Sequence, residues 1–136
     1  MMSEGTDALI TEILTAALPE VVAIYRFGST AKGQAVRESD LDIAVLPAAP
    51  LDPVVRWDLQ EGLAVALHAA VDLVDLLRSS TVMRMQVLDA SVLLYEGDRK
   101  ARQRFETAAY SAYARLNEER REILEQVRRE GTVYGR

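Results

Sequence analysis

Residues 27–33 read Phe-Gly-Ser-Thr-Ala-Lys-Gly, and residues 39–45 read Ser-Asp-Leu-Asp-Ile-Ala-Val. An apolar run rich in β-branched and aromatic residues ends at Gly28, and a second apolar run follows Asp42, so both runs have the composition of buried strands. Asp40 and Asp42 are spaced i, i+2, which on an extended strand points both carboxylates from the same face. The sequence therefore predicts one strand that ends in a glycine-serine turn and another that begins with two carboxylates.

The chemistry of these residues indicates a phosphate-binding turn beside a metal site. Gly28 allows a close approach of the backbone, Ser29 offers a hydroxyl donor, and the amides at the start of a short helix over residues 29–33 would receive anionic oxygens. Adjacent carboxylates repel each other unless a cation compensates their charge. Oxygen ligands without histidine or cysteine favour Mg2+ or Mn2+ over Zn2+. Either half alone is typical of an ordinary turn or strand, whereas the two together favour nucleotide and metal binding.

Length, composition and charge limit the function classes. A chain of 136 residues, of which 49% are hydrophobic, can build the core of one domain and leaves little room for a second domain that would hold a large substrate. The absence of cysteine excludes disulfides and thiolate metal sites. The net charge of -5 argues against direct binding of nucleic acid. No apolar run is long enough to span a membrane and no signal peptide is visible, so we expect a cytoplasmic protein.

Hydrophobic periodicity and capping residues predict alternating helices and strands. Thr6 is expected to cap the first helix, Ser79 or Ser80 the third, and Asp98 the last, which Gly131 would stop. The predicted helices cover residues 6–17, 54–70, 80–88 and 98–130, and the predicted strands cover residues 21–27, 41–46, 71–77 and 91–95. This alternation is typical of an α/β fold.

The last predicted helix carries a narrow apolar stripe. Its apolar positions recur at the three- and four-residue steps of a heptad seam, and they are Phe105, Ala109, Ala112, Leu116, Ile123 and Val127. We therefore divide the chain into a main domain over residues 1–97 and a helical tail over residues 98–136 that packs on the domain or on a partner. Trp57 and Tyr95 are expected to be core or helix-packing residues, and His68, the only histidine, is expected to have an ordinary structural or surface role.

The pattern Gly28-Ser29, ten intervening residues, then Asp40-Leu41-Asp42 resembles the signature of the DNA polymerase beta-like nucleotidyltransferase superfamily. Together with Val-Asp-Leu-Val-Asp-Leu at residues 71–76, it is similar to the minimal nucleotidyltransferase branch of that superfamily, and the likeness covers residues 8–97. The resemblance implies a nucleotidyltransferase fold, in which helices pack on a small mixed β-sheet and a long C-terminal helix follows.

The resemblance also implies roles for the matched carboxylates. Asp40 and Asp42 would hold two Mg2+ ions that bridge the triphosphate of ATP, and a third carboxylate would complete the site of the catalytic metal. Asp72 and Asp75 compete for that third role, and their odd separation places them on opposite faces of a strand. Asp72 is preferred because it stands where the family pattern has its carboxylate.

The phosphates of the bound nucleotide would lie on the turn. Gly28 and Ser29 stand where the family binds the β and γ phosphates, and Lys32 is placed to reach the triphosphate. A lysine beside a turn is also commonly just solvated, so both interpretations of Lys32 stay open.

Members of this branch are commonly the antitoxin of a HEPN/MNT toxin-antitoxin pair, in which the nucleotidyltransferase transfers AMP to a tyrosine of a HEPN ribonuclease and silences it. The resemblance therefore implies a Mg2+-dependent protein adenylyltransferase that uses ATP and forms a hetero-oligomer with a HEPN-type toxin. Two alternatives stay open: an antitoxin that blocks the toxin by contact alone through the tail helix, and nucleotidyl transfer to tRNA or a small molecule. The set of carboxylates disfavours the first, and the small size and negative charge disfavour the second.

Overall fold

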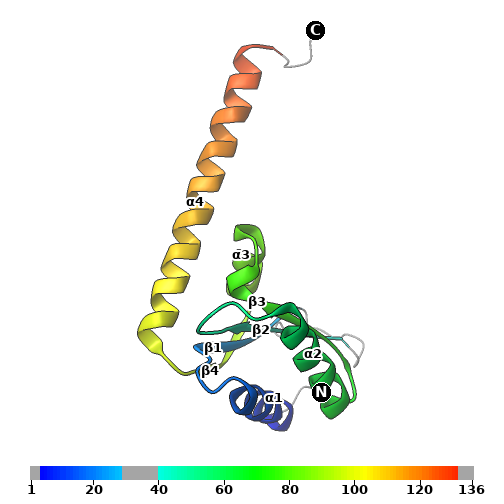
Figure 1. Cartoon of the computed structure of the whole chain (residues 1–136). Helices are drawn as coiled ribbons and strands as arrows, with labels where there is room; N and C mark the ends of the chain where they lie inside the picture. The colour runs from blue at the N-terminus through cyan, green and yellow to red at the C-terminus, as the bar shows by residue number, and fades with distance from the viewer. Residues whose placement is uncertain (1–3, 29–39, 132–136) are drawn as a thin grey trace.

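Strands and helices alternate along the chain in a computed structural model that describes residues 4–28 and 40–131 (Figure 1). The elements in chain order are α1 (Glu4–Ala17), β1 (Ala23–Phe27), β2 (Asp40–Leu46), α2 (Pro53–Leu67), β3 (Ala70–Asp75), the 3-10 turn η1 (Leu76–Arg78), α3 (Thr81–Asp89), β4 (Val92–Glu96) and α4 (Arg99–Arg129). None of the helices within these residues is long and apolar enough to cross a lipid bilayer.

The strands form one mixed sheet in the order β3-β2-β1-β4. β1 runs antiparallel to both β2 and β4, whereas β2 and β3 are parallel. A parallel pair needs a crossover connection, and α2 supplies it between β2 and β3. The predicted α/β fold, with a small mixed sheet packed by helices and a long C-terminal helix, is confirmed.

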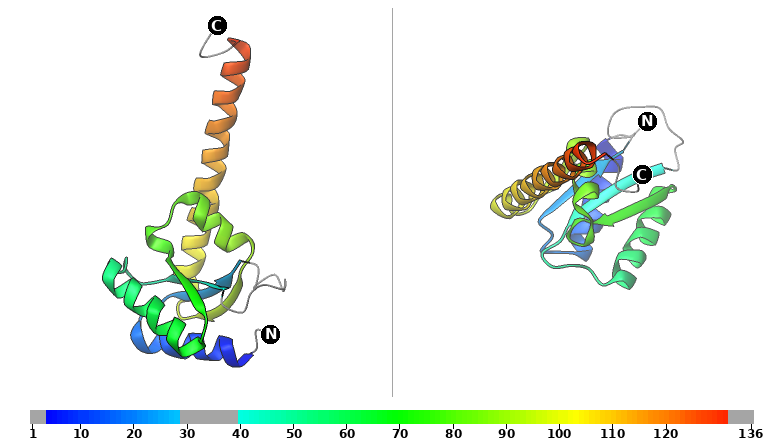
Figure 2. Two further views of the ribbon diagram at one scale, coloured as in Figure 1. Left: turned by 90° about the vertical axis from the view of Figure 1, so that its right-hand side faces the viewer. Right: turned by 90° about the horizontal axis from the view of Figure 1, so that it is seen from above.

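Helices cover both faces of the sheet, and Figure 2 shows the two layers from further directions. Alternate residues of each strand point to opposite faces, so the sheet contributes to two separate apolar clusters. The cluster against α1 and α2 contains Ile10, Leu14, Ile24, Ile43, Val45, Leu63 and Leu73. The cluster against α3 and the beginning of α4 contains Ala23, Tyr25, Phe27, Ala44, Leu46, Val87 and, partly buried, Phe105. We call these the α1–α2 face and the α3–α4 face.

A polar network attaches the beginning of α4 to the sheet. The Tyr25 hydroxyl donates to Glu106 at 2.8 Å, and Arg102 donates to Glu106 at 2.7 Å. Arg102 also donates to Glu96 of β4 at 2.6 Å. Burial, followed by the hydrogen bond to Glu106, raises the pKa of Tyr25 above its ordinary value. The network therefore joins β1, β4 and α4 on the α3–α4 face.

α4 is much longer than the surface that it covers. It has 31 residues, begins at the Asp98 cap and ends before Gly131, which has a φ of 84°. Ala109 is buried against the domain, but the helix continues beyond it and projects away from the sheet (Figure 1). The capping residues Asp98 and Gly131 are as predicted, whereas the predicted boundary between two units at residue 97 stays a prediction.

Two predicted element ends were wrong because local polar geometry intervenes. α2 ends at Leu67 rather than residue 70, because His68 adopts a left-handed conformation with φ 54° and caps the helix. β3 ends at Asp75 rather than residue 77, because the Asp75 side chain accepts a hydrogen bond from Leu77 N and starts η1. His68 therefore has the structural role that was expected, as a C-cap.

Other expectations concern single side chains. Thr6 does not cap α1, since the helix already includes Glu4 and Thr6 lies inside it. Of the two candidate serines, Ser80 caps α3 by accepting from Met83 N at 3.1 Å. Trp57 is not a core residue, because its side chain is 54% exposed on α2. Tyr95 packs partly buried against the α1–α2 cluster.

Candidate active site

Gly28 marks the end of β1 and the start of the candidate site. Its φ is 81°, a conformation that side chains other than glycine rarely adopt. A Cβ at this position would also collide with the Asp42 carboxylate, whose Oδ2 lies against the Gly28 backbone. The turn after β1 is therefore held directly against a carboxylate of the next strand, and only glycine fits there.

Strand register brings two of the predicted carboxylates together. Asp42 lies opposite Phe27 in the antiparallel pair of β1 and β2, and opposite Asp72 in the parallel pair of β2 and β3. Partners in register point to the same side, which for Asp42 and Asp72 is the α3–α4 face. Asp42 is half-buried and Asp72 is exposed. Gly28, Asp42 and Asp72 thus form a continuous row across three neighbouring strands.

Asp75, the other candidate for the third carboxylate, is separated from this row. It lies opposite Val45 on the α1–α2 face and is 4% exposed. Its Oδ2 accepts from Leu51 N at 2.8 Å, and its Oδ1 accepts from Leu77 N at 2.9 Å. Both oxygens therefore fix the chain before α2 and after β3, and the structure brings Asp72, not Asp75, beside Asp42.

Three predicted site residues lie wholly or partly outside the described residues. Ser29 and Lys32 fall in the segment 29–39, which the structure does not describe. The backbone of Asp40 begins β2 and pairs with Ala70, while its side chain lies outside the description. Among the side chains that are described, no group of three or more His, Cys, Asp or Glu residues is arranged to hold a metal.

The donor set of the row fits a magnesium ion and its nucleotide. Asp42 and Asp72 provide oxygen ligands only, and Mg2+ typically takes one or two carboxylates together with phosphate oxygens and water. Within the described part of the chain, no hydrogen bond or ion pair involves the Asp72 carboxylate. This exposed carboxylate is therefore available to a cation.

An ion pair beneath the turn was not predicted. Arg26 Nε donates to Asp7 Oδ1 at 3.0 Å, and Arg26 Nη2 donates to Asp7 Oδ2 at 3.3 Å. Arg26 precedes Phe27 on β1 and points to the α1–α2 face, so the pair joins the start of α1 to the end of β1 that carries Gly28. An arginine inside an otherwise apolar strand is the signal that could have indicated such a partner, because a buried charge needs compensation.

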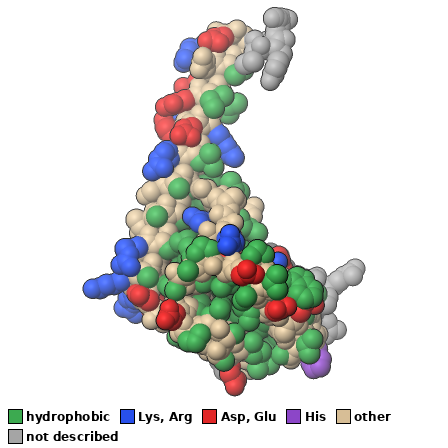
Figure 3. All heavy atoms as spheres, viewed as in Figure 1, with side chains coloured by type: hydrophobic (Ala, Val, Ile, Leu, Met, Phe, Trp, Pro, Cys, Tyr) green, Lys and Arg blue, Asp and Glu red, His purple; other side chains and the backbone are tan. Residues whose placement is uncertain are grey.

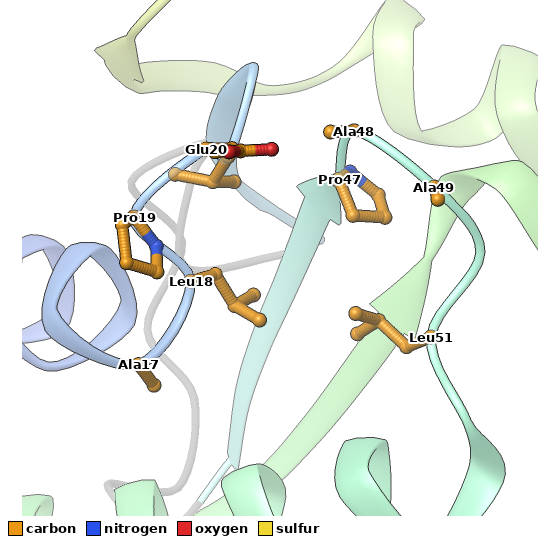
Figure 4. A pocket seen from close by; sticks show the side chains of 9 residues that line it. Ala17, Leu18, Pro19, Glu20, Pro47, Ala48, Ala49 and Leu51 are labelled. Carbon is orange, nitrogen blue, oxygen red and sulfur yellow. The ribbon is translucent and has the colours of Figure 1, made fainter.

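An apolar hollow of the domain lies at the other end of the sheet. It has a volume of about 330 Å3 and is lined by residues that precede β1 and follow β2, as Figure 4 shows. The lining residues are Ala17, Leu18, Pro19, Glu20, Val21, Pro47, Ala48, Ala49 and Leu51. Since Glu20 is the only charged residue in this lining, the hollow is not suited to phosphate, and the row around Asp42 remains the candidate active site.

Comparison with known proteins identifies relatives over the same residues. The family described as Polymerase beta, Nucleotidyltransferase matches residues 9–100, from α1 to the beginning of α4. A protein adenylyltransferase MntA of Shewanella oneidensis is 39% identical over 126 residues, which are 93% of this chain and 90% of that protein. A probable protein adenylyltransferase MntA of Haemophilus influenzae is 32% identical over 93 residues, which are 68% of this chain and 81% of that protein.

Solved structures agree with these matches. A crystal structure of a toxin-antitoxin with AMP-PNP contains a chain that is 40% identical, with a TM-score of 0.79 over 89% of this chain and 97% of that chain. A structure of tri-AMPylated Shewanella oneidensis HEPN toxin in complex with MNT antitoxin contains a chain that is 36% identical, with a TM-score of 0.77 over 93% of this chain and 98% of that chain.

Proposed function

Because the chain belongs to the Polymerase beta nucleotidyltransferase family, we propose that it is a protein adenylyltransferase that acts as the antitoxin of a HEPN-type toxin. The nucleotide is ATP, and the acceptor is a tyrosine hydroxyl of the toxin. The family prediction made from the glycine-serine turn and the aspartates is confirmed by the match over residues 9–100. The adenylyltransferase relatives and the toxin-antitoxin structures support the choice of a protein acceptor.

One observation carries the proposal: the register of three strands places Gly28, Asp42 and Asp72 in one row on one face. An antitoxin that only binds its toxin would have no need for two carboxylates beside a glycine turn, because like charges directly opposite each other on neighbouring strands are destabilising. Nucleotidyl transfer does give a reason, since it needs an anionic nucleotide to be held with its counter-ion at a fixed place.

The reaction is an in-line displacement at the α phosphate of ATP. The tyrosine oxygen attacks the α phosphorus, a new P–O bond forms, and the bond to the bridging oxygen of the β phosphate breaks, so pyrophosphate leaves with the bond electrons. The tyrosine proton passes to a base. We assign proton acceptance to Asp72, which is exposed on the face where the acceptor arrives, and substrate orientation to the Gly28 backbone and Asp42.

We further propose Mg2+ as the metal, held by Asp40, Asp42 and Asp72, because the donors are oxygens and the substrate is a triphosphate. When bound, Mg2+ ions would neutralise the developing negative charge on the phosphates. Ser29 and Lys32 are assigned to the β and γ phosphates on the sequence pattern alone. Since the donor is ATP, we place the reaction in the cytoplasm.

The proposed reaction is tested by following the labelled α phosphate of ATP to its acceptor. Full-length protein is incubated with ATP labelled at the α phosphate, Mg2+ and either total tRNA or the product of the adjacent gene, which this proposal expects to be a HEPN-type toxin. The variants are Asp42→Asn and Asp72→Asn, and the matched control is Asp58→Asn, an exposed carboxylate on α2. We expect label on the protein with the wild type and the control, and none above background with the two site variants.

Two results would contradict the proposal. If both site variants still neutralise the toxin fully in cells, the chain is a binding antitoxin without a required reaction. If label appears on tRNA and not on the protein, the acceptor is a nucleic acid. If the two site variants lose both the transfer of label to the toxin and the neutralisation of the toxin, the proposal is supported.

A further inference from the structure

The second half of α4 carries an apolar face that the described residues leave uncovered. Ile123 and Leu124 are each 61% exposed, although Ile123 continues the heptad steps on which Ala109 is buried against the domain. We call Leu116, Ile123, Leu124 and Val127 the distal seam. In Figure 3, hydrophobic side chains follow the edge of the helix that overlooks α3, and acidic side chains gather along the opposite edge. The apolar face therefore extends beyond the surface that it can cover within the chain.

The distal seam rises from the same face of the sheet as the candidate active site. α3 and the beginning of α4 pack on the α3–α4 face, the face to which Asp42 and Asp72 point. The segment from residue 114 to Arg129 is about 24 Å long at 1.5 Å per residue. A protein that approaches Asp72 from the open side of this face would thus come alongside the distal seam.

A hollow lies in the corner between α3 and α4, where the seam begins. It has a volume of about 290 Å3 and is lined by Val82, Met85, Gln86, Asp89 and Tyr113. Val82 is exposed, so the hollow opens to the solvent and not into the core. Its lining combines apolar and polar side chains, so it has room and contacts for one side chain of a protein partner.

Charge argues against nucleic acid as the occupant of this surface. Between Arg115 and Glu130 the helix has five arginines and five glutamates, so it offers no net positive charge to a phosphate backbone. The apolar residues at three- and four-residue steps instead match the way in which one helix lies along another.

The solved relatives indicate which class of protein the surface fits. The two toxin-antitoxin structures cover 89% and 93% of this chain. Each structure leaves fewer residues of this chain unmatched than the segment 114–136 contains. The likeness therefore reaches into the second half of α4. The family match, by contrast, ends at residue 100, where α4 has barely begun. At least part of the second half of α4 is thus shared with chains from toxin-antitoxin structures.

We propose that the distal seam and the α3–α4 hollow are the docking surface for the acceptor protein, and that this surface places the acceptor tyrosine over Asp42 and Asp72. The inference rests on the proposed function for the identity of the occupant. The seam holds a helix of the acceptor, the hollow receives one of its side chains, and the network of Tyr25, Arg102 and Glu106 fixes the angle of α4 to the sheet.

The test separates docking from catalysis by measuring association without ATP. The variants are Ile123→Glu with Leu124→Glu on the seam, the milder Ile123→Ala with Leu124→Ala, and Val82→Glu in the hollow. The matched control is Val65→Glu, an apolar side chain of α2 that is 74% exposed on the other face. Binding of the toxin is measured by biolayer interferometry, ATP binding by calorimetry, and helix content by circular dichroism.

We expect the double glutamate variant to weaken toxin binding about 30-fold or more, and the double alanine and Val82→Glu variants about 5- to 10-fold, since each removes apolar contact area. ATP binding and helix content stay at the wild-type value, and Val65→Glu binds the toxin normally. In the labelling assay the glutamate variant raises the KM for the toxin and leaves kcat within about 3-fold.

An unchanged affinity of the double glutamate variant overturns the docking surface, whatever the labelling shows. The docking surface is also overturned if the isolated chain sediments as a dimer, and the double glutamate variant dissociates this dimer but still binds the toxin. The distal seam would then bind a second copy of this chain. Seam-dependent binding without transfer of label contradicts the proposed reaction and leaves the docking surface supported.

Discussion

β3 carries two aspartates, Asp72 and Asp75, that are three residues apart and differ in burial and in hydrogen bonding. Asp75 is buried, and both of its oxygens accept hydrogen bonds from backbone amides, so the chain itself satisfies it. Asp72 is exposed beside Asp42, and no hydrogen bond or ion pair within residues 4–28 and 40–131 involves its carboxylate. A carboxylate that accepts hydrogen bonds from the chain stabilises the fold. A carboxylate that lies unpaired beside another carboxylate lowers stability, and such an arrangement is typical of a functional site.

The largest expected effect of a single substitution is on catalysis. Asp72→Asn keeps the shape of the side chain and removes the charge, so we expect the rate of label transfer to fall about 10³-fold, or about 4 kcal/mol in the activation free energy. The free energy of unfolding stays within about 0.5 kcal/mol of the wild type, because the residue is exposed and loses a like-charge neighbour. Single-turnover kinetics and urea denaturation measure the two quantities. A normal rate would show that Asp72 has no part in the reaction.

The complementary substitution at Asp75 is expected to act on stability. Asp75→Ala leaves the amides of Leu51 and Leu77 without their acceptor, which should lower the free energy of unfolding by about 2–4 kcal/mol. Label transfer per folded molecule should change far less than with Asp72→Asn. Urea denaturation monitored by circular dichroism gives the stability, and the folded fraction corrects the rate. If Asp75→Ala were as stable as the wild type but did not transfer label, Asp75 and not Asp72 would be the aspartate that the reaction needs.

Gly28→Ala tests the contact between the turn and Asp42. The added Cβ meets the carboxylate and also forces a left-handed conformation on alanine, which costs about 1–2 kcal/mol. Because the turn must move from Asp42, we expect transfer to fall about 10²-fold, with the larger part in kcat. Gly62→Ala is the matched control, since a Cβ there meets nothing within 4 Å. If Gly28→Ala retained full activity, the close contact would not be needed for the reaction.

The sequence predicted the polar row better than it predicted where each element ends. The spacing of the glycine turn and the first two aspartates indicated Gly28 and Asp42, and parity along the next strand placed Asp72 and Asp75 on opposite faces. The family resemblance then selected Asp72 from those two. The ends of α2 and β3 could not be predicted, because they depend on the left-handed His68 and on hydrogen bonds of Asp75 to distant residues. The exposure of Trp57 was missed for a related reason: composition does not tell which face of a helix a sheet will cover.

The smallest expected effect concerns a polar group that, like Asp75, is satisfied by the chain. Tyr25→Phe removes the hydrogen bond to Glu106 and should cost about 1 kcal/mol of stability at pH 7. Burial raises the pKa of Tyr25 in the folded state, so the unfolded chain loses this proton at a lower pH than the folded chain. The contribution is therefore complete below the unfolded pKa and declines above about pH 10. Urea denaturation between neutral and alkaline pH should show a steeper loss for the wild type than for Tyr25→Phe, and parallel curves would mean that Tyr25 ionises equally in both states.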